Sequence, residues 1–338
     1  MSLKTRIAAI GSGLLAFNLL AWLWALLAFR DHPLLLGTAL LAYSFGLRHA
    51  VDADHIAAID NVTRKLMQEG RRPVAVGLYF SLGHSTVVAA LSLLLAATTT
   101  ALQERFSDLK EMGGLIGTGV SAAFLFAIAA ANMMVLAGVW RAFRAAKAGH
   151  RLADTDLDVL LAGGGPLTRL FRRLFRLIGA SWHMYPLGLL FGLGFDTATE
   201  VGLLGISAMG ASNGLSPWAI MVFPALFSAG MALVDTADGI LMLGAYDWAF
   251  VKPIRKLYYN LTVTSVSVLV AVLVGGVEVL GLIADRLQLD GPFWRAFALL
   301  NEHFGLFGYG IVAVFAAGWL TSLAVWRIKG YDRIETAS

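Results

Sequence analysis

The sequence predicts an all-α polytopic membrane protein, and three features predict it: composition, the length of the apolar stretches and the placement of basic residues. Hydrophobic residues make up 58% of the 338 residues and charged residues only 14%, whereas soluble domains carry about 25% charged residues. The mean hydropathy is +0.72. Such a chain has too little polar surface to fold in water, so its net charge of +4 is interpreted as a topology signal.

Eight apolar stretches are long enough to cross a bilayer as helices, since one crossing needs about 20 apolar residues. They lie at 7–29, 34–62, 74–99, 114–140, 183–210, 217–245, 259–284 and 304–326. We therefore expect a single transmembrane domain over residues 1–338. The polar segment at about 141–180 is the only sizeable one, and it is expected to form a cytoplasmic loop.

Basic residues predict the orientation of these spans. With the N-terminus inside, the cytoplasmic segments hold 20 of the 26 Lys and Arg residues and the outer segments hold five. The remaining one, Arg48, lies within a span. Because basic residues accumulate on the cytoplasmic side, both termini are expected to be cytoplasmic.

Ionisable residues lie inside the predicted spans, where each costs about 2.5–3.5 kcal/mol at mid-bilayer. Six acids, three histidines and one arginine are embedded in this way: Asp52, Asp54, Asp196, Glu200, Asp235, Asp238, His49, His55, His84 and Arg48. The excess of acids predicts an anionic interior that accommodates a cation. Cysteine is absent, so imidazole and carboxylate are the available ligands, a combination that suits Ni²⁺, Co²⁺, Zn²⁺ or Fe²⁺.

Helical spacing predicts that these side chains converge. On an ideal helix, His49, Asp52 and His55 share one face. Asp196 and Glu200 are four residues apart, and Asp235 and Asp238 are three apart, so each pair also shares a face.

Short repeated segments predict an internal repeat. Phe45-Gly46-Leu47 and Phe191-Gly192-Leu193 precede acidic motifs in the second and fifth spans, and the related segments 80–83 (FSLG) and 227–230 (FSAG) follow them in the third and sixth. A shift of three spans reverses direction across the membrane, so spans 1–3 and 4–6 are expected to form an inverted repeat. Many secondary transporters bind substrate at the interface of such repeats.

Four motifs resemble those of the nickel/cobalt transporter (NiCoT) family, in the same order. The segment Arg48–Ile56 resembles the family's second-span signature, with its His-x₄-Asp-His core at His49, Asp54 and His55. Segments 80–88, 193–200 and 230–238 resemble the motifs of the third, fifth and sixth spans. The resemblance covers essentially the whole chain.

The resemblance implies a secondary transporter, not an enzyme, that imports Ni²⁺, Co²⁺ or both across the cytoplasmic (inner) membrane of a bacterium. The metal would be the transported substrate rather than a cofactor. Membrane lipid is the expected surrounding, no nucleic-acid partner is expected, and no ATPase subunit is expected because the chain has no Gly-x-x-x-x-Gly-Lys-Ser/Thr phosphate loop.

The predicted site residues fall into three groups. The expected metal site comprises His49, Asp52, Asp54, His55 and His84. The expected cation pathway or coupling residues are Asp196, Glu200, Asp235 and Asp238, and the residues expected to support the site are Arg48, Ser85, Thr197 and Thr236.

Two alternatives remain open. One is an efflux permease, which differs from an importer in whether cells lose or accumulate the metal. The other is an intramembrane metalloenzyme, which is disfavoured because the His-Glu-x-x-His motif of zinc proteases is missing and a di-iron site would need more than three embedded histidines.

Overall fold

The computed structural model describes residues 2–97, 100–147, 178–194, 198–249 and 253–303, with 306, 308–314, 317 and 321 beyond them. These residues form eleven α-helices and one 3₁₀ turn, and they include no β-strand. Five helices are long and apolar enough to cross a membrane, or six candidate spans if a bent pair of helices counts as one. The predicted all-α membrane architecture is therefore confirmed at this coarser level.

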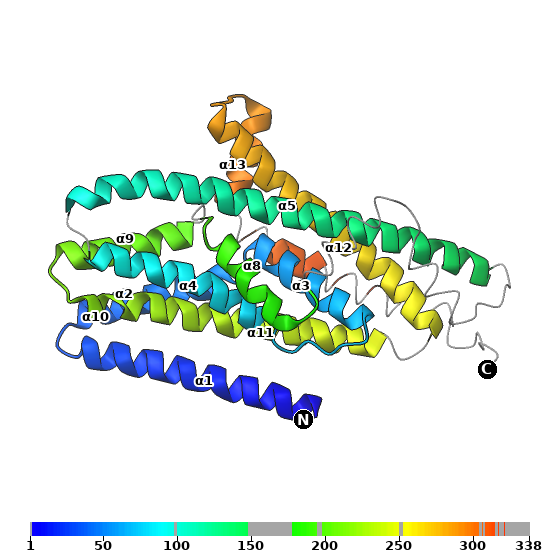
Figure 1. Cartoon of the computed structure of the whole chain (residues 1–338), viewed down its shortest axis with the longest axis horizontal. Helices are drawn as coiled ribbons and strands as arrows, with labels where there is room; N and C mark the ends of the chain where they lie inside the picture. Colours follow the sequence, from blue (N-terminus) through cyan, green and yellow to red (C-terminus); the bar gives the residue numbers. More distant parts are fainter. Residues whose placement is uncertain are drawn as a thin grey trace.

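The helices lie mostly side by side along one long axis (Figure 1). Their bounds are α1 Leu3–Ala28, α2 Pro33–His49, α3 Ala53–Gln68, α4 Val76–Ala97, α5 Thr100–Lys147, α8 Met184–Phe191, α9 Ala198–Ser212, α10 Pro217–Ile220, α11 Val222–Ala249, α12 Pro253–Arg286 and α13 Pro292–Glu302. The 3₁₀ turn, Ser181–His183, precedes α8 directly.

Local sequence signals start several of these helices. Ser2 caps α1 by accepting a hydrogen bond from the Thr5 backbone N–H, and Ser216 caps α10 by accepting one from Ala219. Pro33 begins α2 and Pro217 begins α10, where the missing proline N–H costs no helical hydrogen bond.

The second predicted span is broken in the middle. The helix α2 ends at His49, α3 begins at Ala53, and the two are bent by 50°. Together the two helices pass as one candidate span that is broken in the middle. Asp52 occupies the N-cap position of α3, but its side chain caps no backbone N–H; the carboxylate instead lies against His49.

The fifth predicted span, 183–210, is also divided, into α8 and α9. In Figure 1, α2 leads into α3 from left to right, whereas α8 leads into α9 from right to left. The two pairs of helices therefore run in opposite directions along the bundle (Figure 1).

Glycines allow two helix pairs to pack backbone against backbone. A Cβ atom at Gly46 of α2 would overlap the Phe227 carbonyl of α11, and one at Gly188 of α8 would overlap the Phe80 carbonyl of α4. Only glycine permits such close approach. The broken helix of each half of the chain therefore packs on a long helix of the other half.

Two features at the helix ends differ from prediction. Residues Arg64 and Lys65, predicted to lie in a cytoplasmic segment, are buried within α3, at 1% and 7% exposure. The helix α5 continues to Lys147, so the predicted loop at about 141–180 begins helically. Residues 148–177 of that loop, and most of the predicted span 304–326, lie outside the described residues.

The surface and interior divide as expected in lipid. Six of the eight leucines of α1 are exposed to at least 50%, namely Leu15, Leu19, Leu20, Leu23, Leu26 and Leu27. Polar and ionisable side chains are instead buried around the break between α2 and α3. The site therefore lies in the interior, and the apolar residues form much of the outer surface.

Candidate metal centre

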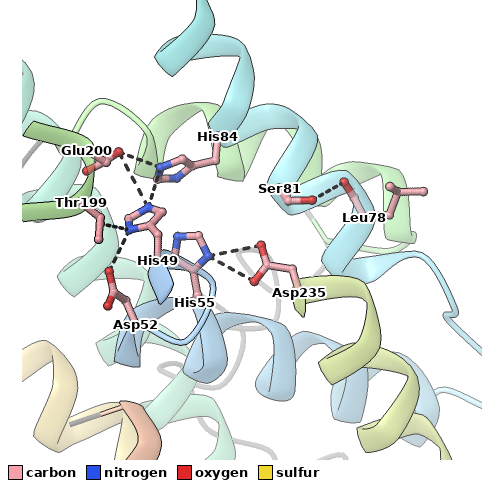
Figure 2. Close-up of polar contacts among 9 residues, drawn as sticks. All are labelled: His49, Asp52, His55, Leu78, Ser81, His84, Thr199, Glu200 and Asp235. Carbon is pink, nitrogen blue, oxygen red and sulfur yellow. Dashed lines mark hydrogen bonds and ion pairs between the residues drawn. The ribbon is translucent and has the colours of Figure 1, made fainter. Parts of the chain in front are cut away.

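Three histidines from three helices meet beside the break in the second span. His49 is the last residue of α2, His55 lies in the first turn of α3, and His84 lies in α4. Each offers a ring nitrogen within 4.8 Å of the others, and none is more than 2% exposed. Figure 2 shows the three rings facing one another. The structure thus brings together all three histidines that the sequence analysis placed in the site.

Two carboxylates orient two of these histidines. The Nδ1 atom of His49 lies 2.8 Å from Asp52 Oδ2, and the Nδ1 atom of His55 lies 3.3 Å from both oxygens of Asp235. A carboxylate accepts a hydrogen bond from Nδ1–H, and in that neutral tautomer Nε2 keeps its lone pair. Histidines that bind metals are commonly oriented in this way, so Asp52 and Asp235 suit an orienting role.

The Nε2 atoms and one further carboxylate form a compact group of donor atoms. The Nε2 atom of His49 lies 2.9 Å from that of His84, and Glu200 Oε1 lies 2.8 Å from His84 Nε2 and 3.8 Å from His49 Nε2. Two ligands about 2.1 Å from one metal ion and about 90° apart lie about 3 Å from each other. These separations therefore fit a divalent cation held between the three atoms.

Two ring nitrogens have no hydrogen-bond partner within the part of the chain that the structure describes. They are Nε2 of His55 and Nδ1 of His84. Buried polar atoms are normally satisfied, so an unpartnered Nε2 on an oriented histidine is suited to a cation. The surrounding carboxylates would offset the cation's positive charge.

The other predicted ligand, Asp54, lies at the edge of the group. It occupies the first turn of α3, is only partly buried and is near enough for its charge to act on His49. It contributes no atom to the three-histidine group. Direct ligation by Asp54 stays a prediction.

The remaining predicted residues divide by position. Ser85 and Thr236 are buried beside site residues, and their hydroxyls have no hydrogen-bond partner among the described residues. Asp238 is partly buried one turn beyond Asp235 on α11. Arg48 is exposed and is not among the residues whose polar contacts make up the site. Two more fall outside the described residues: Asp196 and Thr197.

Three residues that the sequence analysis did not select also contact the histidines. The Thr199 hydroxyl lies 3.3 Å from His49 Nδ1. The ring of Phe80 lies 4.8 Å from the His55 ring, and the ring of Phe227 lies 5.5 Å from the His49 ring, between centroids. Thr199 directly precedes Glu200 and was detectable from its motif, whereas phenylalanines within apolar spans give no distinguishing signal.

Long apolar helices around a buried group of imidazoles and carboxylates are typical of multi-pass membrane proteins that bind a transition-metal cation within the helix bundle. Comparison with known proteins identifies the family. A model of the High-affinity nickel-transport protein family matches residues 35–325, and the chain belongs to this family. It is a family of transporters and not of enzymes.

Relatives with assigned names support this assignment. The chain is 59% identical over 332 residues to a High-affinity nickel transport protein of Cupriavidus necator, covering 98% of this chain and 95% of the relative. It is 55% identical to the Hydrogenase nickel incorporation protein HupN of Bradyrhizobium diazoefficiens, with 95% and 84% coverage. It is 41% identical to the Cobalt transport protein NhlF of Rhodococcus rhodochrous, with 87% and 84% coverage. No solved structure matches the chain.

Proposed function

We propose that this protein is a secondary transporter that imports Ni²⁺, Co²⁺ or both across the bacterial cytoplasmic membrane, through the buried histidine centre. The observation that carries the proposal is the set of oriented donor atoms: His49 and His55 each turn Nδ1 toward a carboxylate and keep Nε2 for the cation. The names of the relatives, nickel transport and cobalt transport proteins, supply the metals.

The proposed ligands are His49, His55, His84 and Glu200. Imidazole nitrogen and carboxylate oxygen are ligands that Ni²⁺ accepts, and both Ni²⁺ and Co²⁺ bind such sites. Glu200, expected from the sequence to belong to the cation pathway, is proposed as a ligand because its Oε1 atom lies 2.8 Å from His84 Nε2. Asp235 and Asp238, one turn apart on α11, then continue a negatively charged route away from the histidines.

An inverted repeat would account for the arrangement around the site. The glycines that end the FSLG and FSAG segments, Gly83 and Gly230, each lie against the broken helix of the other half of the chain. Gly83 packs on α8 at Tyr185 and Leu189, and Gly230 packs on α2 at Tyr43 and Leu47. Exchange of the two halves by a pseudo-two-fold axis predicts this crosswise pattern.

The membrane topology completes the proposal. Eight spans, both termini in the cytoplasm and a cytoplasmic loop at about 141–180 follow from the apolar stretches and the placement of basic residues. A single chain is proposed to transport the metal without an ATPase subunit. Lipid is the proposed surrounding of the exposed leucines of α1.

The test is accumulation of radiolabelled nickel and cobalt, at nanomolar concentrations, by cells that express the protein. Cells with the wild-type chain are expected to accumulate metal, and the His55→Ala variant, expressed to the same level, is expected to lose this accumulation. The matched control is His32→Ala, because His32 is exposed at the start of α2 and its side chain makes no cap hydrogen bond.

Each result of this experiment separates the alternatives. Accumulation that depends on His55 supports import, and the ratio of the two metals gives the preference. A faster loss of preloaded metal from cells with the wild-type chain would indicate efflux instead. Equal accumulation with and without His55 would contradict the histidine centre.

A further inference from the structure

Two phenylalanines cover the histidine centre. The ring of Phe80, on α4, meets the His55 ring edge to face at 4.8 Å and 85°. The ring of Phe227, on α11, lies tilted against the His49 ring at 5.5 Å and 36°. Both phenylalanines are 0% exposed. Each histidine that is oriented by a carboxylate is therefore also covered by one aromatic ring.

The two rings lie on opposite sides of the centre along the bundle. The Phe227 backbone lies against Gly46, about one turn before His49 in α2. The Phe80 backbone lies against Gly188, about one turn before Gly192, which itself lies against the His84 backbone. Since α2 and α8 run in opposite directions along the bundle (Figure 1), the two phenylalanines flank the histidines.

Each phenylalanine belongs to a cluster of buried apolar residues on its side of the histidines. Phe80 packs with Leu66, Met184 and Phe191, and Phe227 packs with Phe29 and Phe223. A hydrated divalent cation does not pass a constriction of this kind, because its water cannot be replaced by apolar atoms. Among the described residues, apolar clusters thus lie on both sides of the histidine centre along the bundle.

The two phenylalanines occupy equivalent positions in the sequence. Phe80 begins the segment FSLG and Phe227 begins FSAG, in helices that run in opposite directions (Figure 1). In an inverted repeat, equivalent residues exchange sides of the membrane. A closing residue on one side therefore has its counterpart on the other.

We propose that Phe80 and Phe227 are the two gates of the metal centre: Phe80 closes it toward the cytoplasm, Phe227 closes it toward the outside, and transport opens one at a time. The proposal deepens the proposed function and rests on its orientation of the chain. The barrier is apolar and acts on the hydrated cation, while the ligands themselves remain the histidines and Glu200.

Thiol labelling tests the proposal directly, because the chain contains no cysteine and a single introduced cysteine has no background. The reporters are Ser85→Cys and Thr236→Cys, each adjacent in sequence to a site residue and buried. Full-length protein in sealed vesicles of either orientation is treated with a membrane-impermeant thiol reagent, in the presence of a metal chelator. The rate of labelling reports access from each side.

The expected results are opposite for the two gates. Phe227→Ala should raise the labelling rate from the outside by at least about tenfold, and Phe80→Ala should do the same from the cytoplasmic side, since truncation shifts each opening equilibrium. The conservative Phe→Leu variants should stay near wild type, because leucine keeps the closure apolar. Equal labelling from both sides, or no change in either variant, would overturn the proposal.

Matched controls remove residues of the same size from the same clusters. Phe223→Ala acts in the cluster of Phe227 and Phe124→Ala in that of Phe80, and neither ring is stacked on a histidine in the structure. They should leave the labelling rate unchanged; increases as large as those of the gate variants would show general loosening and overturn the assignment. Cobalt absorption spectra of each purified variant verify that the ligand set is intact.

A flux measurement provides an independent test. In proteoliposomes, the double variant Phe80→Ala/Phe227→Ala is expected to let cobalt leak down its gradient, at a rate that rises linearly with the cobalt concentration. Neither single variant is expected to leak. A double variant that shows no cobalt leak but still gives the cobalt absorption spectrum would contradict the two gates. Failure of the proposed function would appear differently, as nickel accumulation that does not depend on His55.

Discussion

The carboxylates around the histidines would act at different distances from a bound cation. Asp52 and Asp235 contact Nδ1 atoms, on the far side of each ring from Nε2, whereas Glu200 contacts Nε2 of His84. A group behind the ring affects the metal through the basicity and orientation of the imidazole. A group beside Nε2 affects it directly. Their substitutions should therefore differ in severity.

The orienting role of Asp235 predicts graded losses. Asp235→Asn keeps an oxygen that accepts the Nδ1–H hydrogen bond but removes the charge, so we expect the half-saturating metal concentration to rise about tenfold. Asp235→Ala also removes the hydrogen bond and should raise it about a hundredfold. The measurement is nickel uptake against concentration in cells with matched expression.

The control for these variants is Asp285→Asn, on an exposed residue at the end of α12. It should leave uptake unchanged. An Asp235→Ala variant with the wild-type half-saturating concentration would exclude the orienting role, even if its maximal rate had fallen.

At the residue scale, the sequence predicted which residue types gather but not which atom each one approaches. His49, His55 and His84 were selected because histidine is rare within apolar spans. The different roles of Asp235 and Glu200 were not predictable. Helical spacing shows which residues share a face of a helix, but it does not show which nitrogen of a distant imidazole each carboxylate contacts. Burial of Arg64 within α3 was also missed, because a basic residue near the end of an apolar stretch is typical of a loop.

At the element scale, the break between α2 and α3 decides how the site is assembled. Residues 50–52 contain neither proline nor glycine, so the sequence shows no helix breaker there. One local and one tertiary contact lie at the break: Asp52 contacts His49 three residues before it, and Gly308 packs so closely on Val51 that a Cβ atom would overlap its carbonyl oxygen. Glycines near the acidic motif allow a broken helix there, but the position of the break could not be predicted, because Gly308 is distant from Val51 in the chain.

The close contact between α2 and α11 predicts a severe effect of added volume. Gly46→Val should separate the two backbones and move His49, at a cost of about 3 kcal/mol, the upper end for overpacking. We expect loss of uptake and a lower melting temperature of the purified protein. Thermal unfolding and nickel uptake are the measurements.

The matched variant on the same helix is Gly37→Val. Gly37 is exposed and has no neighbour within 4 Å of an added Cβ atom, so this change should leave both measurements close to wild type. Equal losses in the two variants would point to helix propensity rather than to packing against Phe227.

At the scale of the whole molecule, charge is separated between interior and surface. The net charge is +4, yet the buried centre is lined by Asp52, Glu200 and Asp235. Basic residues in the segments assigned to the cytoplasm fit a role in orientation, although Arg64 and Lys65 are buried in α3, and acids inside fit a role in attracting a cation. The two functions of charge are compatible because they use different parts of the fold.

This separation predicts which end of the bundle faces the cytoplasm. Single cysteines at Ser2 and Arg71 should react with an impermeant thiol reagent only in inside-out vesicles, and those at Asp31 and Asn213 only in right-side-out vesicles. All four positions are exposed at helix ends, and 20 of the 26 basic residues lie in the segments assigned to the cytoplasm.

The pattern of labelling distinguishes two kinds of error. Complete reversal would leave the bundle as described and overturn the orientation, and with it the assignment of Phe80 to the cytoplasmic gate. Reaction of Ser2 and Asp31 from the same side would instead contradict α1 as a membrane span, although its 26 residues exceed the about 20 that one crossing needs. Since Asn213 follows α9 directly, its side further tests whether α8 and α9 together complete one crossing.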